Sequence, residues 1–228
     1  MAAALALSAA GAHLTLISRT HREIDEVAQE IRRRGGIADA IPLDVTDSQA
    51  VEDVLSHFPP FEILINSAGT NKPALLTETN MSDLDMVMNL NIRSTFLMTK
   101  EVVKGMVEAK KGGSIVTISS QMGHVGGIKR SVYCASKHAV EGMTKALAWE
   151  LGSHGIRVNT LCPTFIETAM TAPMLADPEF RNYVESKIAL GRIGKLEDLM
   201  GAVVFLCSDA ASMVTGSALM VDGGWTSI

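Results

Sequence analysis

Short, largely apolar runs alternate along the chain with longer segments in which apolar residues recur at helical spacing. The short runs predict buried strands, at His13–Ser18, Ile37–Leu43, Phe61–Asn66, Ser114–Ser120, Ile156–Cys162 and Ala218–Val221. Such strands, alternating with helices, are typical of a parallel sheet covered on both faces. With no linker or repeat in view, the pattern predicts an α/β fold with a doubly wound parallel sheet, in a single domain over residues 1–228.

The remaining periodic segments predict helices, at residues 1–10, after Thr20, after Thr46, at 82–110, 133–153 and 197–208. Thr20 with Glu23, and Thr46 with Gln49, have the spacing of capping boxes. The long helix from Ser82 is expected to be interrupted near Asn89–Asn91, and residues 163–194 are expected to be irregular with short helices.

Composition narrows the function classes. Of the 228 residues, 47% are hydrophobic and 20% charged, with a formal net charge of −5, so a folded core is expected and nucleic acid is not the expected partner. No apolar run approaches the roughly 20 residues of a membrane span. Three cysteines without a C-x-x-C pair indicate a reduced, cytoplasmic protein. The scattered histidines predict no histidine-rich metal site.

The ends of the predicted strands carry the candidate chemistry, because ligands of such sheets bind outside the carboxyl ends of the strands. Those ends are Ser18-Arg19, Asp44-Val45, Asn66–Gly69, Ser119-Ser120 and Cys162–Thr164. Just beyond the fourth strand, Tyr133 and Lys137 stand four residues apart, on one face of a predicted helix. A lysine cation near a phenol favours the phenolate and lowers its pKa, which is a device for acid–base catalysis.

Taken together and in this order, the motifs resemble the short-chain dehydrogenase/reductase family over nearly the whole chain. They are Asn66-Ser67-Ala68-Gly69, Asn91 within Asn-Ile-Arg-Ser-Thr-Phe, Ser120, Tyr133-x-x-x-Lys137, Pro163 followed by Ile166-Glu167-Thr168, and Val221-Asp222-Gly223-Gly224. The resemblance implies a Rossmann-like sheet and an oxidoreductase.

In that family the four residues matched by Asn91, Ser120, Tyr133 and Lys137 are catalytic. The resemblance implies that Tyr133 is the general acid for carbonyl reduction and the general base for alcohol oxidation. Lys137 would lower the pKa of Tyr133 and bind the nicotinamide ribose. Ser120 would hold the substrate oxygen, and Asn91 would hold a water in a proton relay.

The resemblance also implies a nicotinamide cofactor at the strand ends. The matching positions are Ser18, Arg19, Asp44, Val45, Asn66, Ala68, Gly69, Tyr133, Lys137, Pro163, Ile166 and Thr168. At the end of the strand that selects between the cofactors, this chain has Ser18-Arg19 and no carboxylate. A guanidinium suits a 2′-phosphate, so NADP is favoured and NAD remains an alternative.

The N-terminal part of the chain departs from the family pattern. The sequence contains no T-G-x-x-x-G-I-G turn and no strand before residues 1–10, which match the helix that follows that turn. We expect roughly the first 20 to 30 residues of a complete unit to be lacking. The missing strand would lie between the strands ending at Ser18 and Asn66, so both would lose hydrogen-bond partners.

The substrate is expected to be a small carbonyl compound or alcohol. Pro163-Thr164, Ser119–Gln121 and Val132–Cys134 resemble sugar-active members of the family, which favours a sugar or polyol, with a 3-oxoacyl substrate as the alternative. Residues 170–183 are the expected lid, and Gln121, His124 and Lys72 are further pocket candidates.

The family usually forms dimers and tetramers, here through residues 82–110 and 131–153, with contacts from Trp225 and Ile228, which are expected to be exposed. A homotetramer is the expected assembly. A non-catalytic shortened subunit that pairs with full-length partners, or a fragment of an active enzyme, is the alternative function.

Overall fold

The computed structural model describes all 228 residues. Its strands are β1 (His13–Ser18), β2 (Ile37–Pro42), β3 (Ile63–Asn66), β4 (Gly113–Ile118), β5 (Ile156–Pro163) and β6 (Ala218–Val221). Its α-helices are α1 (Ala2–Ala9), α2 (His21–Arg33), α3 (Ser48–Leu55), α4 (Met81–Met88), α5 (Ser94–Ala109), α6 (Ser131–Leu151), α7 (Ala172–Leu175), α8 (Pro178–Lys187) and α9 (Glu197–Cys207). The predicted α/β class with parallel strands is confirmed.

The sheet is divided into two pieces. One contains β1 and β2, and the other has the order β3-β4-β5-β6. Every pairing is parallel. β1 pairs only with β2, and β3 only with β4, so the sheet is broken between the strands that end at Ser18 and Asn66. This is the position at which the sequence predicts lost hydrogen-bond partners.

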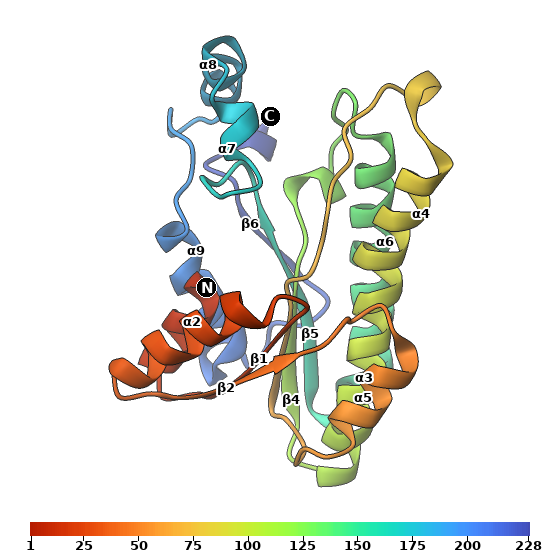
Figure 1. The fold of residues 1–228 in the computed structure, drawn as a ribbon, viewed down its shortest axis with the longest axis vertical. Helices are drawn as coiled ribbons and strands as arrows, with labels where there is room; N and C mark the ends of the chain where they lie inside the picture. Colours follow the sequence, from red (N-terminus) through yellow and green to blue (C-terminus); the bar gives the residue numbers. More distant parts are fainter.

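Helices cover both faces of the sheet (Figure 1), and their apolar side chains pack against both pieces. On one face, α3, α5 and the end of α6 form the largest core cluster, which includes Leu43, Met106 and Ile115. On the other face, α1 and α9 bring Leu7 and Val203 against Val116 and Leu161. Leu14 of β1 and Ile65 of β3 pack against this second cluster. Apolar packing therefore links the pieces where backbone hydrogen bonds do not.

Two predicted helix caps differ from the structure. Thr20 is the N-cap of α2, but its side chain makes no capping hydrogen bond. The N-cap of α3 is Asp47 and not Thr46, because the Asp47 carboxylate accepts from the backbone N–H groups of Gln49 and Ala50. Thr46 instead donates to Asp44, at 2.7 Å from Oγ1 to Oδ1.

The predicted interruption of the long helix is confirmed and has a definite form. α4 and α5 are joined by a π-helical turn, Asn89–Arg93, which includes Asn91. π-Turns inside α-helices are rare and occur often at functional sites. The widened turn separates Asn91 from the regular helical repeat on either side.

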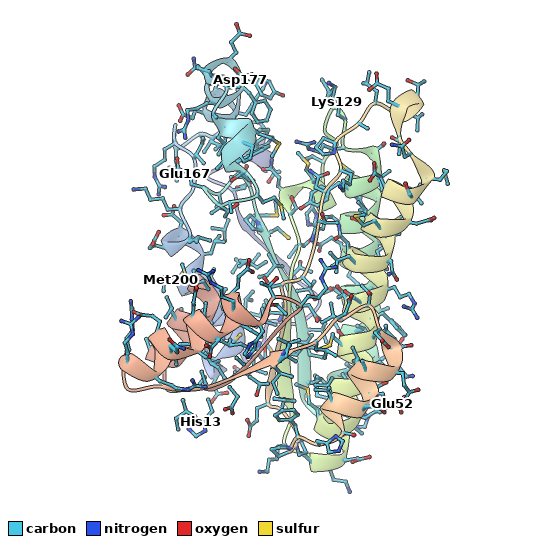
Figure 2. The ribbon with its side chains drawn as sticks, viewed as in Figure 1. His13, Glu52, Lys129, Glu167, Asp177 and Met200 are labelled. Carbon is cyan, nitrogen blue, oxygen red and sulfur yellow. The ribbon has the colours of Figure 1, made fainter.

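The strands run toward the end of the molecule at which the candidate site lies. Figure 2 shows His13, the first residue of β1, near one end, and Glu167 and Lys129 toward the other. Glu167 follows β5, and Lys129 follows β4 by a loop. None of the helices combines the length and the apolar character that crossing a bilayer requires.

Candidate functional site

Asn91 is fixed by three hydrogen bonds in the π-turn. It is buried, its Oδ1 accepts from Thr70 N at 2.8 Å, and its Nδ2 donates to Thr70 O at 2.9 Å and to Ser136 Oγ at 3.0 Å. These bonds connect the loop after β3, the turn between α4 and α5, and helix α6. The structure thereby brings Asn91 to the helix that carries Tyr133 and Lys137.

Lys137 is buried at the end of β4. Its Nζ donates to the carbonyl oxygen of Ile118 at 2.8 Å and lies 5.6 Å from the centre of the Tyr133 ring. Burial lowers the pKa of Lys137 from 10.5 to about 8. A Cβ placed on Gly69 would lie 3.4 Å from Asn91 Oδ1 and 3.8 Å from Lys137 Nζ, so the absence of a side chain keeps this corner open.

Tyr133 has an environment that differs from the sequence-based prediction. Burial raises the pKa of Tyr133 above its usual value, and the Ser120 hydroxyl and the Arg130 guanidinium oppose that increase. The expected lowering by Lys137 is not seen, because Lys137 Nζ lies over the face of the ring and is itself buried and bonded to Ile118. The phenol therefore carries its proton at neutral pH but is a weaker acid than the sequence predicts.

Unpaired polar atoms mark the carboxyl ends of β4 and β5. The side-chain oxygens of Ser119, Gln121 and Thr164 are buried without a hydrogen-bond partner. Ser120 Oγ beside them accepts from the Met122 backbone N–H, at 3.1 Å. Buried polar groups are almost always paired in folded proteins. A polar ligand at this edge would supply the missing partners, which fits a cofactor and a hydroxylated substrate.

The two-stranded piece carries four of the cofactor candidates. Arg19 is exposed directly after β1, next to Ser18, and it contributes to lowering the pKa of Asp44. The larger cause of that lowering is the Thr46 backbone N–H, which donates to Asp44 Oδ1 at 2.9 Å. Val45 packs against the largest core cluster. The structure thus places Arg19 and Asp44 together at this edge, with the Arg19 guanidinium free of any ion pair within 4.0 Å.

The remaining cofactor candidates lie on the four-stranded piece, and they differ in what their side chains do. Asn66 is buried and donates to Thr99 Oγ1 at 3.0 Å, so its side chain is hydrogen-bonded within the core. Ile166 is also buried and forms an isolated β-bridge with Gly194. Thr168 caps the turn into α7 by hydrogen bonds with Thr171. Ala68 follows the end of β3, and Pro163 is the last residue of β5.

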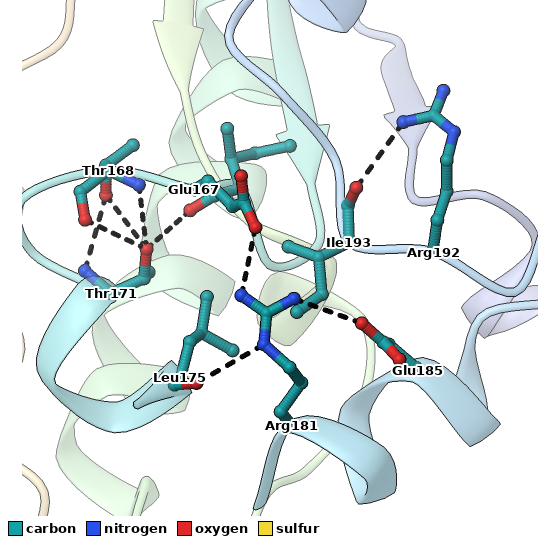
Figure 3. Close-up of polar contacts among 9 residues, drawn as sticks. Glu167, Thr168, Thr171, Leu175, Arg181, Glu185, Arg192 and Ile193 are labelled. Atoms are coloured by element: carbon teal, nitrogen blue, oxygen red, sulfur yellow. Dashed lines mark hydrogen bonds and ion pairs between the residues drawn. The ribbon is translucent and has the colours of Figure 1, made fainter. Parts of the chain in front are cut away.

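The predicted lid contains helices α7 and α8. An open hollow of about 410 Å³ lies beside them, lined by Glu167, Thr168, Ala172, Leu175, Ala176 and Arg181. Figure 3 shows how Arg181 ties the segment together, donating to Glu167 at 3.0 Å, to Glu185 at 3.2 Å and to the Leu175 carbonyl at 3.3 Å. None of the predicted catalytic residues lines this hollow, so it belongs to the lid and not to the reaction centre.

The C-terminal prediction is partly wrong. Trp225 is not exposed: its ring stacks on Phe165, with 5.8 Å between the ring centres. Ile228 is exposed. The tryptophan is covered because the chain end returns to the lid, where Phe165 and Phe180 form an apolar cluster with Leu175 and Val184.

The further pocket candidates have different outcomes. Gln121 is buried at the end of β4, whereas Lys72 is at the surface, 3.9 Å from Asp83. His124 lies 3.6 Å from Glu141 and 3.7 Å from Cys162 Sγ, a grouping that the sequence did not reveal. The side chains of His124, Glu141 and Cys162 carry atoms of metal-ligand type within 4.8 Å of one another. They form a hydrogen-bonded network in which Cys162 Sγ–H donates to Glu141 at 3.3 Å.

Arg130 is a residue near the site that the sequence reasoning missed. It is the N-cap of α6, is buried, and lies close enough to Tyr133 to lower the pKa of the phenol. The available signal was its position, three residues before Tyr133 at the start of the predicted helix. Sequence alone could not show that this cation is buried.

Comparison with known proteins gives one consistent result. Residues 1–226 match the family model described as enoyl-(acyl carrier protein) reductase. The chain is 36% identical over 221 residues to L-xylulose reductase of Mesocricetus auratus, covering 97% of this chain and 89% of that protein. It is 39% identical over 206 residues to 3-oxoacyl-[acyl-carrier-protein] reductase FabG of Thermotoga maritima, covering 88% and 82%.

The fold has a close counterpart among solved structures. A gluconate 5-dehydrogenase from Burkholderia cenocepacia, in complex with NADP and tartrate, superposes with a TM-score of 0.95 at 28% identity, covering 100% of this chain and 90% of that one. These findings confirm the predicted family and the enzyme class of dehydrogenases and reductases. The chain therefore belongs to the short-chain dehydrogenase/reductase family.

Proposed function

We propose that this chain transfers a hydride between NADP(H) and a small ketone or secondary alcohol of the sugar, polyol or 3-oxoacyl type. The observation that carries the proposal is the arrangement at the end of β4, where Asn91 bonds to Ser136 of α6, Lys137 bonds to the Ile118 carbonyl, and the Lys137 ammonium lies 5.6 Å from the centre of the Tyr133 ring. The relatives named L-xylulose reductase and 3-oxoacyl-[acyl-carrier-protein] reductase support the substrate classes.

In reduction, Tyr133 donates its phenolic proton to the carbonyl oxygen while the carbonyl carbon accepts a hydride. When bound, NADPH supplies that hydride and becomes NADP⁺. Because burial raises the pKa of Tyr133, the phenol carries its proton at neutral pH. Ser120, whose hydroxyl influences the Tyr133 phenol, holds the substrate oxygen beside it.

Lys137 and Asn91 support this proton transfer. Lys137 binds the nicotinamide ribose and holds its charge beside Tyr133, and Asn91 fixes the geometry of the site through Thr70 and Ser136. Gly69 leaves the space between Asn91 and Lys137 accessible to the cofactor or to a water of the proposed relay.

Arg19 supplies the preference for NADP over NAD. It is exposed at the end of β1 without an ion pair, and a guanidinium there binds a 2′-phosphate by charge-assisted hydrogen bonds. NADP is also present in the gluconate 5-dehydrogenase structure that superposes on this chain.

The working form is a homo-oligomer, a dimer or tetramer. Helices α5 and α6, which the resemblance to the family assigns to subunit contacts, expose large apolar side chains: Phe96 is 51% exposed and Trp149 is 90% exposed. Exposed apolar residues on such helices are suited to burial against a second copy.

The test is the loss of NADPH absorbance with a panel of ketoses, keto acids and 3-oxoacyl thioesters. We expect turnover of at least one member, abolished by Tyr133→Phe. Absence of turnover across the panel, in a protein that binds NADPH, would refute the proposed reaction. Equal turnover by the variant would refute the role of Tyr133.

A further inference from the structure

Arg130 holds a buried charge without an anionic partner. Its side chain is only 8% exposed, and it takes part in none of the ion pairs of the structure. The one hydrogen bond that its guanidinium makes is from Nη2 to the sulfur of Met174, at 3.3 Å. A thioether is a weak acceptor, so four of the five N–H donors of this side chain have no protein partner.

Another partly buried arginine shows what a structural guanidinium looks like in this protein. Arg157 donates to the carbonyl oxygens of Leu206 and Ser208, at 2.9 and 3.1 Å. Those bonds tie β5 to the end of α9. Removing a charge from water is costly unless the charge is paired. Arg157 is compensated by backbone oxygens, whereas Arg130 has no oxygen acceptor.

The surroundings of Arg130 hold its side chain in place. A Cβ on Gly127 would lie 3.1 Å from Arg130 Cγ and 3.1 Å from Met122 Cε, so the glycine provides the space through which the arginine stem runs. Met174 belongs to α7, in the predicted lid. The guanidinium thus lies between the start of α6 and the predicted lid. It is close enough to Tyr133 to interact electrostatically with the phenol.

We propose that Arg130 binds the carboxylate of the substrate, and that the chain acts on sugar-derived keto acids in preference to neutral ketoses. A guanidinium presents paired N–H donors that match the two oxygens of a carboxylate. A carboxylate bound by Arg130 would help to orient the carbonyl toward Tyr133, which lies three residues further along α6. This inference rests on the proposed function and narrows its substrate class.

The test uses two substrates that differ only in the anionic group. 5-Keto-D-gluconate carries a carboxylate where L-sorbose carries a hydroxymethyl group, and both present the same ketone. For Arg130→Met, which retains an apolar stem, we expect kcat/KM for the keto acid to fall roughly tenfold to a hundredfold. We expect kcat/KM for L-sorbose to fall by a clearly smaller factor, because only the effect of the Arg130 charge on Tyr133 is lost, so the ratio of the two kcat/KM values measures the binding of the carboxylate.

Two further variants test whether the loss of activity on the keto acid is specific to the guanidinium of Arg130. Lys129→Met removes the neighbouring exposed cation and should leave the preference for the keto acid intact. Arg130→Lys retains the charge without the planar fork and should fall between the wild type and Arg130→Met. Equal losses on both substrates, or the same loss in Lys129→Met, would overturn the proposal.

A binding measurement separates this inference from the proposed reaction. Calorimetry with D-gluconate and D-sorbitol, which differ in the same group, requires no turnover. Tighter binding of D-gluconate that Arg130→Met removes would support the inference even if no ketone is reduced. Turnover of ketones without any preference for the acid would overturn the inference and leave the proposed function standing.

Discussion

The two pieces of the sheet build their sites by different means. On the four-stranded piece, the candidate catalytic residues are fixed by long-range, buried hydrogen bonds, such as those of Asn91 with Thr70 and Ser136. On the two-stranded piece, Arg19 is exposed, and Asp44 is fixed only by its near neighbour Thr46. The contrast indicates that the chemistry depends on tertiary structure, whereas the cofactor preference depends on a local, exposed side chain.

The pieces also differ in how they are held. β3 to β6 form a continuous hydrogen-bonded ladder, whereas β1 and β2 pair only with each other. The smaller piece is attached by apolar packing, mainly through Leu14 against the cluster of α1 and α9 and through Leu43 against the large core. Changes to the buried, hydrogen-bonded residues of the larger piece, such as Asn91, should therefore affect catalysis and stability together, and changes at Arg19 should affect cofactor affinity alone.

The largest effect is expected at Tyr133. Tyr133→Phe removes the proton donor and should lower kcat/KM for ketone reduction by roughly 10²- to 10⁴-fold. Steady-state kinetics measures this loss, with thermal unfolding as the control that should not change. A variant that keeps more than half of the wild-type rate would refute the assigned role.

A pH-dependent stability difference is expected at Lys137. Burial lowers its pKa from 10.5 to about 8, so between those values the unfolded chain binds more protons than the folded one. The free energy of unfolding of the wild type should therefore rise with pH across this window, relative to Lys137→Met, by on the order of 3 kcal/mol. Urea unfolding of both proteins at pH values spanning the window measures the difference. A constant difference would show that the lysine is not desolvated.

Asn91 should affect both stability and activity. Asn91→Ala leaves the N–H and C=O groups of Thr70 without their partner and should lower the free energy of unfolding by about 1 to 3 kcal/mol. Asn89→Ala, in the same π-turn, removes only a long contact to Arg93 of 3.5 Å and should cost less than about 0.5 kcal/mol. Chemical denaturation compares them, and similar losses would contradict the special role of Asn91.

The smallest effect is expected at Arg19. Arg19→Ala should weaken NADPH binding roughly tenfold and leave NADH binding unchanged, because only NADPH carries the 2′-phosphate. Arg22→Ala is the matched control, since Arg22 is exposed on α2 and paired with Glu26 at 2.9 Å. If Arg19→Ala weakened the binding of NADPH and NADH equally, Arg19 would not be the residue that binds the 2′-phosphate.

Much of the fold could be predicted from the sequence, because apolar runs and helical spacing determine the order of strands and helices. β6 has the predicted bounds, Ala218–Val221, and the interruption at Asn91 was visible as polar residues within a helical pattern. The start of α3 was displaced by one residue, since Thr46 and Asp47 are both good N-caps and only the folded geometry selects Asp47.

Properties that depend on burial could not be predicted. The spacing of Tyr133 and Lys137 suggested a lowered phenol pKa, but burial raises the pKa and Lys137 bonds to Ile118. The burial of Arg130 depends on Met174, and the grouping of His124 with Cys162 joins residues that are also far apart in the sequence. Neither contact could be predicted from the spacing of residues along the chain. Trp225 was expected to be exposed because nothing in the sequence showed that Phe165 covers it.

Titration of this 228-residue chain with NADPH, followed by cofactor fluorescence, tests the central claim most directly. The claim is that the two pieces together form one cofactor site beside Tyr133. We predict saturable binding with a Kd in the micromolar range, competition by NADP⁺, and weaker binding to Arg19→Ala. Absence of binding, or binding that Arg19→Ala and NADP⁺ leave unchanged, would contradict it.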